Sequence, residues 1–365
     1  MGAPTSNFSR LVDLAKESSS DTRRDLLREM TDAFMGAPEE HSAAEMEHFD
    51  IIMSKVAGEV EAALRKELSE RLADVPTAPS KLINQLANDE FEVAEAVLTK
   101  SSVLSEEALL SIIEKHGQDH MQAISGREEV SERISDELVA RGDDKVLVTL
   151  AKNDGARLSR TAMETMVEKS EKITALQGPL VNRRDLSPDL MNDMYFFVSK
   201  ALRQEILKRT DNLDPALIDK AIRESQAAIL RAAGAKAGTD PSAAEKFVRQ
   251  KIRDREMNEA LLSQLIDERR EAELVHAFAH LAEVDAKTAR RIIGDKSGEA
   301  VALACRAAGF DRATLSKILF ARSDKNPQLL KLVEQYDKLP VQTAQRVMRF
   351  WRVRKQAMEQ AEKAA

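Results

Sequence analysis

The chain is poor in the residues that build sheets and disulfides. Aromatic residues make up 4% of its 365 residues, and there is one cysteine, Cys305. The shortage of aromatics disfavours β-sheets, which draw on aromatic and β-branched side chains. One cysteine excludes an internal disulfide framework and any metal site built from several cysteines. Because Cys305 lies in an apolar stretch, we expect it to be a small buried core residue.

Signature motifs and long apolar runs are also missing. The 13 glycines are scattered, and the sequence contains neither a Gly-rich phosphate loop nor the nucleophile pattern G-x-S-x-G. No run approaches the ~20 apolar residues of a transmembrane helix, and the start of the chain lacks the features of a secretory signal. The net charge of −7 disfavours a nucleic-acid coat. These absences predict a cytoplasmic, non-enzymatic protein without a cofactor or bound metal.

The chain does have a recurring helix-start pattern, an apolar residue followed by Ser, Asp or Asn. Such side chains accept hydrogen bonds from the free N–H groups of a helix's first turn, and Pro188 suits the first helical position. The cap residues follow one another at 26 to 28 residues, except for one step of 44. The pairs are Leu104-Ser105, Val130-Ser131, Leu158-Ser159, Leu186-Ser187, Leu213-Asp214, Met257-Asn258, Val284-Asp285 and Phe310-Asp311.

A period of about 27 residues is typical of stacked helical units. In each unit an amphipathic helix is followed by a break, as at 141–144, and then by a more uniformly apolar helix, as at 146–151. A helix that is apolar on most sides must be covered by neighbours, which stacking of helix pairs supplies. We therefore expect an all-α fold, an α-solenoid of short paired helices resembling HEAT repeats.

Four segments are expected along the chain. Residues 1–79 form an N-terminal helical subdomain with one helix from Phe8, a second from Ser20 and a long third from Ser42 to Leu72. Repeats occupy 80–231 and 255–365. The connection 232–254 contains Gly234, Gly238 and Pro241, with one polar helix capped by Asp240-Pro241.

The sequence also resembles a known family, the alphaproteobacterial family catalogued as domain of unknown function 2336. The resemblance covers about residues 8–355 and implies a HEAT-like repeat protein of the bacterial cytoplasm without an assigned chemistry. It implies no catalytic residues. The matching stretches are Leu86 to Asp89, Val93-Ala94, His120 to Ile124, Arg127, Asp136 to Val139, Arg141 to Asp143, Asn153 to Ala156, Arg184 to Leu186, Ala302 to Gly309 and Arg312 to Thr314.

Arginines recur at equivalent positions of the repeats. Arg127 and Arg183 each stand four residues before a cap, so with Arg184 and Arg141 they are candidates for a basic ladder. Guanidinium groups suit carboxylate or phosphate ligands. In the alternative interpretation these arginines bind backbone carbonyls of neighbouring units and loop acids such as Asp185.

The C-terminal stretch 345–355 holds five cations, no acid and the only tryptophan. Trp351 and Arg352 are its candidate contact residues. One interpretation is a basic amphipathic helix that binds acidic partners, lipid headgroups at a membrane surface, or nucleic acid. The other is a terminal capping repeat, in which the tryptophan covers the last core layer and the cations face water.

Histidines offer two further candidates. Glu273, His276 and His280 share a helix face, but no fourth ligand is evident, so two partly buried helix histidines are expected rather than a metal site. His116 and His120 flank a helix break, where a structural role near the last carbonyls is expected.

The resulting functional hypothesis is a non-enzymatic interaction protein that binds a protein or peptide partner on its repeat surface. One alternative is a nucleic-acid-binding HEAT-like protein. The other is a sensor of a small anionic, nucleotide-type ligand that uses the arginine edge.

Overall fold

The computed structural model describes residues 20–36, 41–211, 242–321 and 327–364. The structure is 75% helical, and its described residues form 21 α-helices and no β-strand. The expected all-α helical-repeat fold is therefore confirmed. None of these helices is long and apolar enough to cross a membrane. The chain divides into two compact units, unit 1 at residues 1–169 and unit 2 at residues 170–365.

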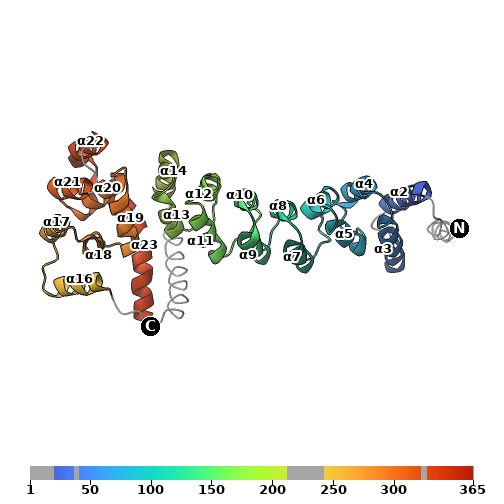
Figure 1. Cartoon of the computed structure of the whole chain (residues 1–365), viewed down its shortest axis with the longest axis horizontal. Coiled ribbons are helices and arrows are strands. Elements are labelled where there is room, and N and C mark those ends of the chain that lie inside the picture. The colour runs from blue at the N-terminus through green and yellow to red at the C-terminus, as the bar shows by residue number, and fades with distance from the viewer. Residues whose placement is uncertain (1–19, 37–40, 212–241, 322–326, 365) are drawn as a thin grey trace. The chain divides into compact units, whose positions relative to one another are not determined.

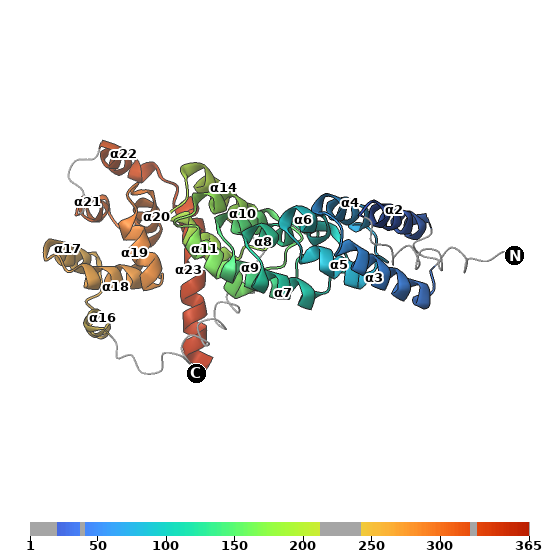
Figure 2. The same ribbon diagram turned by 45° about the vertical axis from the view of Figure 1, so that its right-hand side comes forward.

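Unit 1 is a regular array of ten described helices. Figure 1 shows them in two rows, with even-numbered helices in one row and odd-numbered helices in the other. Most successive helices contact one another across the rows, and α4, α6, α8 and α10 contact along one row (Figure 2). The helices are α2 Ser20–Gly36, α3 Ala43–Ala57, α4 Ala62–Leu72, α5 Ser80–Ala87, α6 Phe91–Lys100, α7 Glu106–Lys115, α8 Gln118–Ser125, α9 Glu132–Arg141, α10 Asp144–Lys152 and α11 Arg160–Lys169.

The packing of unit 1 follows from its apolar stripes. In α10 the side chains of Val146, Leu147 and Leu150 are buried, and the helix contacts α8 in its own row and α9 in the other row. Burial of such side chains between neighbours stabilises each by roughly 1.5–3 kcal/mol relative to exposure. Because the more apolar helix of each pair needs cover on several sides, no pair is stable without its neighbours.

The predicted helix starts are confirmed at most caps. Ser105, Ser131, Asn258, Asp285 and Asp311 each accept a hydrogen bond from a first-turn backbone N–H. The same holds for Ser159, whose hydroxyl accepts the Ala162 N–H at 3.0 Å. The pair Leu213-Asp214 lies outside the described residues.

Ser187 is an exception. It stands at the N-cap position of α13, as predicted, but its side chain makes no capping bond. Instead its hydroxyl donates to Asp189 Oδ1 at 2.7 Å. The expected capping bond at this site is wrong, because the hydroxyl is oriented toward the ionised Asp189 carboxylate, a strong acceptor, and its oxygen does not face the first-turn N–H groups.

The predicted long helix from Ser42 to Leu72 is also wrong. The first helix, α3, ends at Ala57, and a separate helix, α4, begins at Ala62. Gly58 closes α3, consistent with its low helix propensity. A continuous helix would expose one of its apolar faces, whereas the break lets α4 pack on α6. The second predicted helix, Ser20–Gly36, is confirmed, and the one from Phe8 lies outside the described residues.

Unit 2 is built differently, around α13. All eight residues of this helix, Pro188–Tyr195, are buried, because α12, α14 and α23 all contact it. The helices of unit 2 are α12 Thr174–Asn182, α13 Pro188–Tyr195, α14 Lys200–Asp211, α16 Ala243–Arg253, α17 Glu259–Asp267, α18 Glu271–Ala282, α19 Ala286–Gly294, α20 Glu299–Ala308, α21 Arg312–Phe320, α22 Pro327–Gln335 and α23 Val341–Ala364. A short 3-10 turn, Tyr336–Lys338, precedes α23.

Several helices of unit 2 end in a left-handed residue. Arg255, Arg269 and Glu283 have φ of 60°, 57° and 58°, and Gly309 has φ of 79°. At each, the following N–H bonds to a carbonyl one turn back, as in Arg270 N–H to Leu265 O at 2.9 Å. This is the Schellman arrangement, which favours glycine. Three of these positions hold a long side chain instead.

The division into four segments remains a prediction. It is based on the repeat pattern, whereas the two units are defined by compactness, so the units do not test it. The residues of the connection 232–241 lie outside the described residues. The polar helix that follows is observed as α16, and its cap is Ser242, which forms a capping box with Glu245. Asp240 and Pro241 themselves are not among the described residues.

Candidate functional site

The predicted arginine ladder is engaged inside the protein. In unit 1, Arg127 donates to the Leu98 carbonyl at 2.5 Å and to the Ser101 carbonyl at 2.7 Å. Burial lowers the pKa of its guanidinium. In unit 2, Arg183 is 4% exposed and forms a two-pronged bond to Asp185, at 2.9 and 2.7 Å. These are the carbonyl and loop-acid contacts of the alternative interpretation.

The other two members of the ladder lie on the surface. Arg141 pairs with Glu137 at 2.9 Å, one turn earlier on α9, and both side chains are about half exposed. Arg184 is exposed beside its buried neighbour Arg183. Contact of any of these four arginines with a ligand remains a prediction. Two of them, Arg127 and Arg183, already use their guanidinium groups to hold the fold.

The C-terminal helix α23 is part of the core of unit 2. Trp351 is 0% exposed, and its ring packs at 5.4 Å from the rings of both Tyr195 and Phe196. Met348 and Ala344 on the same helix are fully buried as well. The structure therefore agrees with the capping interpretation for Trp351.

The same helix carries cations on its outer side. The side chain of Arg352 pairs with Glu283 at 3.0 Å and lies 3.4 Å from the Ala282 carbonyl. Arg346 and Arg349 are exposed. Since the three arginines are spaced by three residues, they lie along one side of α23.

These arginines line a groove between α20 and α23, which we call the arginine groove. Its volume is about 470 Å³. Every lining side chain except one is either an arginine or a glutamine, so the groove offers hydrogen-bond donors and positive charge, and no acid lines it. The lining residues are Ala307, Gln342, Gln345, Arg346, Arg349 and Arg352. Such a surface suits an anion, and guanidinium forks suit carboxylates and phosphates.

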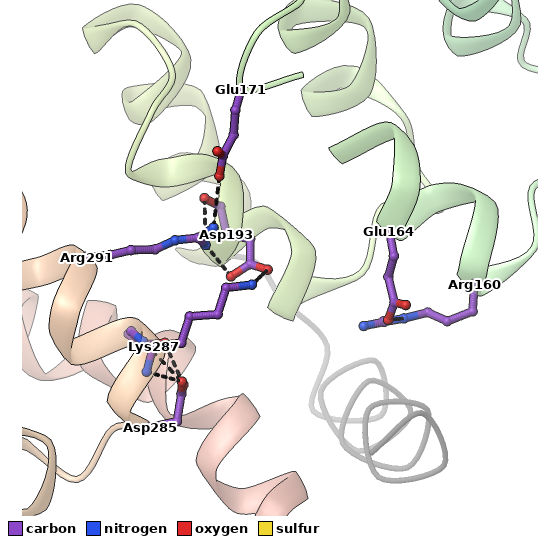
Figure 3. A network of polar contacts seen from close by, with 8 residues as sticks. Arg160, Glu164, Glu171, Asp193, Asp285, Lys287 and Arg291 are labelled. Carbon is purple, nitrogen blue, oxygen red and sulfur yellow. Dashed lines mark hydrogen bonds and ion pairs between the residues drawn. The ribbon is translucent and has the colours of Figure 1, made fainter. Parts of the chain in front are cut away.

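A second charged cluster in unit 2 is structural. The carboxylate of Asp193 on α13 forms ion pairs with Arg291 at 2.5 Å and with Lys287 at 3.2 Å, both on α19 (Figure 3). Arg291 also reaches Glu171 at 3.1 Å. We call this set the Asp193 clasp. The Asp193 side chain is only 10% exposed, so its charge requires these partners. The clasp joins α13 to α19.

Two histidines of unit 1 form a stacked pair. The rings of His116 and His120 lie 4.4 Å apart at an angle of 21°. His120 Nε2 lies 3.0 Å from the Asp89 carbonyl, and His116 Nε2 lies 3.2 Å from Asn88 Oδ1. Burial and the adjacent His120 and Lys115 lower the pKa of His116. The pair therefore serves the structural role that was expected, but toward the preceding helix pair rather than its own helix.

Glu273, His276 and His280 do not form a metal site. Glu273 pairs with Arg270 at 3.1 Å, and within the described ranges no group of three or more potential ligands comes together. His276 is half-buried and His280 is exposed. Cys305 is fully buried, as expected, and burial raises the pKa of its thiol.

Comparison with known families gives one result. A sequence profile of the family described as an uncharacterised protein conserved in bacteria, DUF2336, matches residues 93–349. The chain belongs to this family. No curated protein and no solved structure matches it.

The match confirms the predicted family over a shorter range than the 8–355 of the resemblance. The narrower alphaproteobacterial origin remains a prediction. The DUF2336 region includes the Asp193 clasp, Arg346 and Arg349, whereas Trp351 and Arg352 lie just beyond it.

The sequence-based selection missed Arg346 and Arg349. Both lie in the C-terminal stretch that was singled out, yet Trp351 and Arg352 were chosen from it. The spacing of the arginines by three residues was a usable signal, because it places them on one helix face. The Asp193 clasp gave no comparable signal, since Asp193 is separated from Lys287 and Arg291 by more than 90 residues.

Proposed function

We propose that the protein is a non-enzymatic binding protein of the bacterial cytoplasm whose helix pairs stack as an α-solenoid, and that its arginine groove holds an acidic segment of a protein partner. The observation that supports this proposal is the groove itself. It combines three arginines and two glutamines along one face of a helix whose opposite face is anchored in the core.

The anchoring favours recognition over nonspecific attraction. Because Trp351 and Met348 are buried, α23 cannot rotate, and its outer side keeps a fixed direction. Arg352 is further held by Glu283. A fixed row of guanidinium groups loses little freedom when it binds carboxylates, and preorganisation of this kind favours affinity.

The test uses a synthetic polyglutamate peptide as probe and the full chain at ~50 and ~150 mM salt. We expect calorimetric binding that weakens with salt, since the screening length falls from about 14 Å at ~50 mM to about 8 Å at ~150 mM salt. The variant Arg346→Glu with Arg349→Glu should abolish it. The matched control, Arg249→Glu with Lys331→Glu, changes the net charge equally at exposed positions outside the groove and should leave binding intact.

Duplex DNA is the discriminating second probe. A phosphate-driven binder loses affinity steeply between ~50 and 200 mM salt, with a slope of about 0.9 per neutralised phosphate. We expect no appreciable retention of duplex DNA at ~150 mM salt. Micromolar retention that is lost in the Arg346/Arg349 variant would replace the protein-partner proposal with the nucleic-acid alternative.

A further inference from the structure

The two units carry opposite net charge. Residues 1–169 contain 20 Lys and Arg against 34 Asp and Glu, a net charge of −14, whereas residues 170–365 contain 35 against 28, a net charge of +7. The total of −7 therefore hides a difference of 21 charges between the two parts of one chain. Charge asymmetry of this size generates attraction between unlike parts of different molecules.

Unit 1 has an exposed acidic surface whose charge is opposite to that of the arginine groove. Glu128, Glu129 and Glu132 are exposed around the start of α9. We call these three residues the acidic edge. Glu128 and Glu129 precede the N-cap residue Ser131, and Glu132 is the first residue of α9.

The acidic edge is held in place by its backbone. Val130, between the three acids, is buried, and its N–H bonds to the Gly155 carbonyl at 3.3 Å. Its carbonyl accepts the Arg157 N–H at 3.0 Å. Asn153 adds bonds to the carbonyls of Ser125 and Arg127, at 2.9 and 2.7 Å. The loop that carries the acids is therefore fixed to the next helix pair, as α23 is fixed to the core of unit 2.

We propose that the acidic edge of one copy binds the arginine groove of a second copy, so that the chains associate head to tail. This inference rests on the proposed function, because it names the acidic partner of the groove as another molecule of the same protein. The two contacting surfaces differ, so the contact is heterologous, and each dimer retains one free groove and one free edge. Further copies can add at both ends or close into a ring.

Sedimentation velocity of the full chain over a range of protein concentrations tests the proposal. At ~50 mM salt the weight-average sedimentation coefficient should rise with concentration, and at ~500 mM salt this rise should be lost through screening. Two variants should each weaken association by at least about tenfold, because they place like charges opposite one another. They are the groove variant Arg346→Glu with Arg349→Glu and the edge variant Glu128→Lys, Glu129→Lys and Glu132→Lys.

Mixing the two variants gives the decisive result. The native edge of the groove variant faces the native groove of the edge variant, so an equimolar mixture should form heterodimers that neither variant forms alone. The control pair Arg249→Glu and Lys331→Glu should self-associate like the native chain. Circular dichroism of each variant confirms that the helices are intact before the comparison is made.

The outcomes separate this inference from the proposed function. A native chain that stays monomeric at ~50 mM salt, or variants whose mixture does not associate, overturns the head-to-tail contact. If polyglutamate still binds the groove in that case, the proposed function stands with a different acidic partner. If neither self-association nor polyglutamate binding occurs, both proposals are overturned.

Discussion

Unit 1 and unit 2 contain helices of similar length but hold them together in different ways. In unit 1 the bonds between helix pairs join residues no more than 39 positions apart in the sequence. Some are ion pairs, such as Arg65 with Asp89 at 2.5 Å, and others are bonds to the neighbouring backbone, such as Lys169 to the Val139 carbonyl at 2.9 Å. In unit 2, ion pairs and aromatic rings join segments distant in sequence, as in the Asp193 clasp and at Trp351. A repeated array needs contacts only between neighbouring pairs, whereas a centre such as α13 also needs contacts with helices far away in the sequence.

The largest expected effect tests whether α23 belongs to the core of unit 2. Trp351→Ala removes a fully buried indole that packs on Tyr195 and Phe196. It should lower the free energy of unfolding by about 3–5 kcal/mol. Denaturation followed by far-UV circular dichroism measures this. Arg349→Ala, an exposed change on the same helix, should stay within about 0.5 kcal/mol, and equal effects at both positions would show that α23 is not a core element.

The next effect compares a shielded ion pair with an exposed one. Asp193→Ala leaves Arg291 and Lys287 without their shared carboxylate in a site that is 10% exposed on the Asp193 side. We expect a loss of roughly 2 kcal/mol, reduced from the fully buried case because Arg291 is 20% exposed. In unit 1, Glu137→Ala breaks the exposed pair with Arg141 and should cost at most about 0.5 kcal/mol. Chemical denaturation measures the free energy of unfolding of both variants. Equal losses would show that the Asp193 clasp stabilises the fold no more than an exposed ion pair does.

Helix ends give a smaller effect of opposite sign. Arg269→Gly should stabilise unit 2 by about 0.5–1 kcal/mol, because φ of 57° is strained for a side chain with Cβ but not for glycine. Glu268→Gly, one residue earlier and in the helical region, should destabilise by about the same amount. The reverse substitution, Gly309→Ala, should also destabilise. A higher melting temperature for Glu268→Gly than for Arg269→Gly would contradict this account.

The smallest effect concerns pH in unit 1. The pKa of His116 is lowered from its ordinary value of 6.5, first by burial and then by His120 and Lys115. The unfolded chain therefore binds this proton more readily than the folded chain. The stability contribution of neutral His116 should be complete above about pH 6.5 and should diminish as the pH falls below it. Melts from pH 7.5 to 5.5 should show a shallower decline for His116→Gln than for the native chain.

Local rules predicted much of the fold. The spacing of apolar residues and caps located most helix starts, because capping depends on a few adjacent residues. The rules gave a wrong result at Ser187, because they assign its hydroxyl to the first-turn N–H groups, whereas it donates to the carboxylate of Asp189 two residues later. They also missed the break at Gly58, where the apolar spacing continues across the turn and hides the glycine that closes α3.

The candidate site was less accessible to the same rules. Arg127 and Arg183 were found by their positions, but whether an arginine binds a ligand or a carbonyl depends on groups 26 to 29 residues away, as with Leu98 and Ser101. The arginine groove is formed by α20 and α23 together, and the C-terminal sequence contains only the residues that α23 contributes. The charge difference between the units was present in the sequence, but it acquires meaning only once the boundary at residue 169 is known.

The distances along the chain between bonded residues have a consequence for synthesis on the ribosome. The bonds from Arg127 and His120 to the preceding helix pairs span 26 to 31 residues, so each pair of unit 1 can dock soon after it emerges. The bonds of the Asp193 clasp span 94 to 120 residues, and the contact of Trp351 with Tyr195 spans more residues still. Contacts close in sequence form quickly, and distant ones await loop closure. The acidic unit is therefore expected to complete its folding while the centre of the basic unit, α13, is still uncovered.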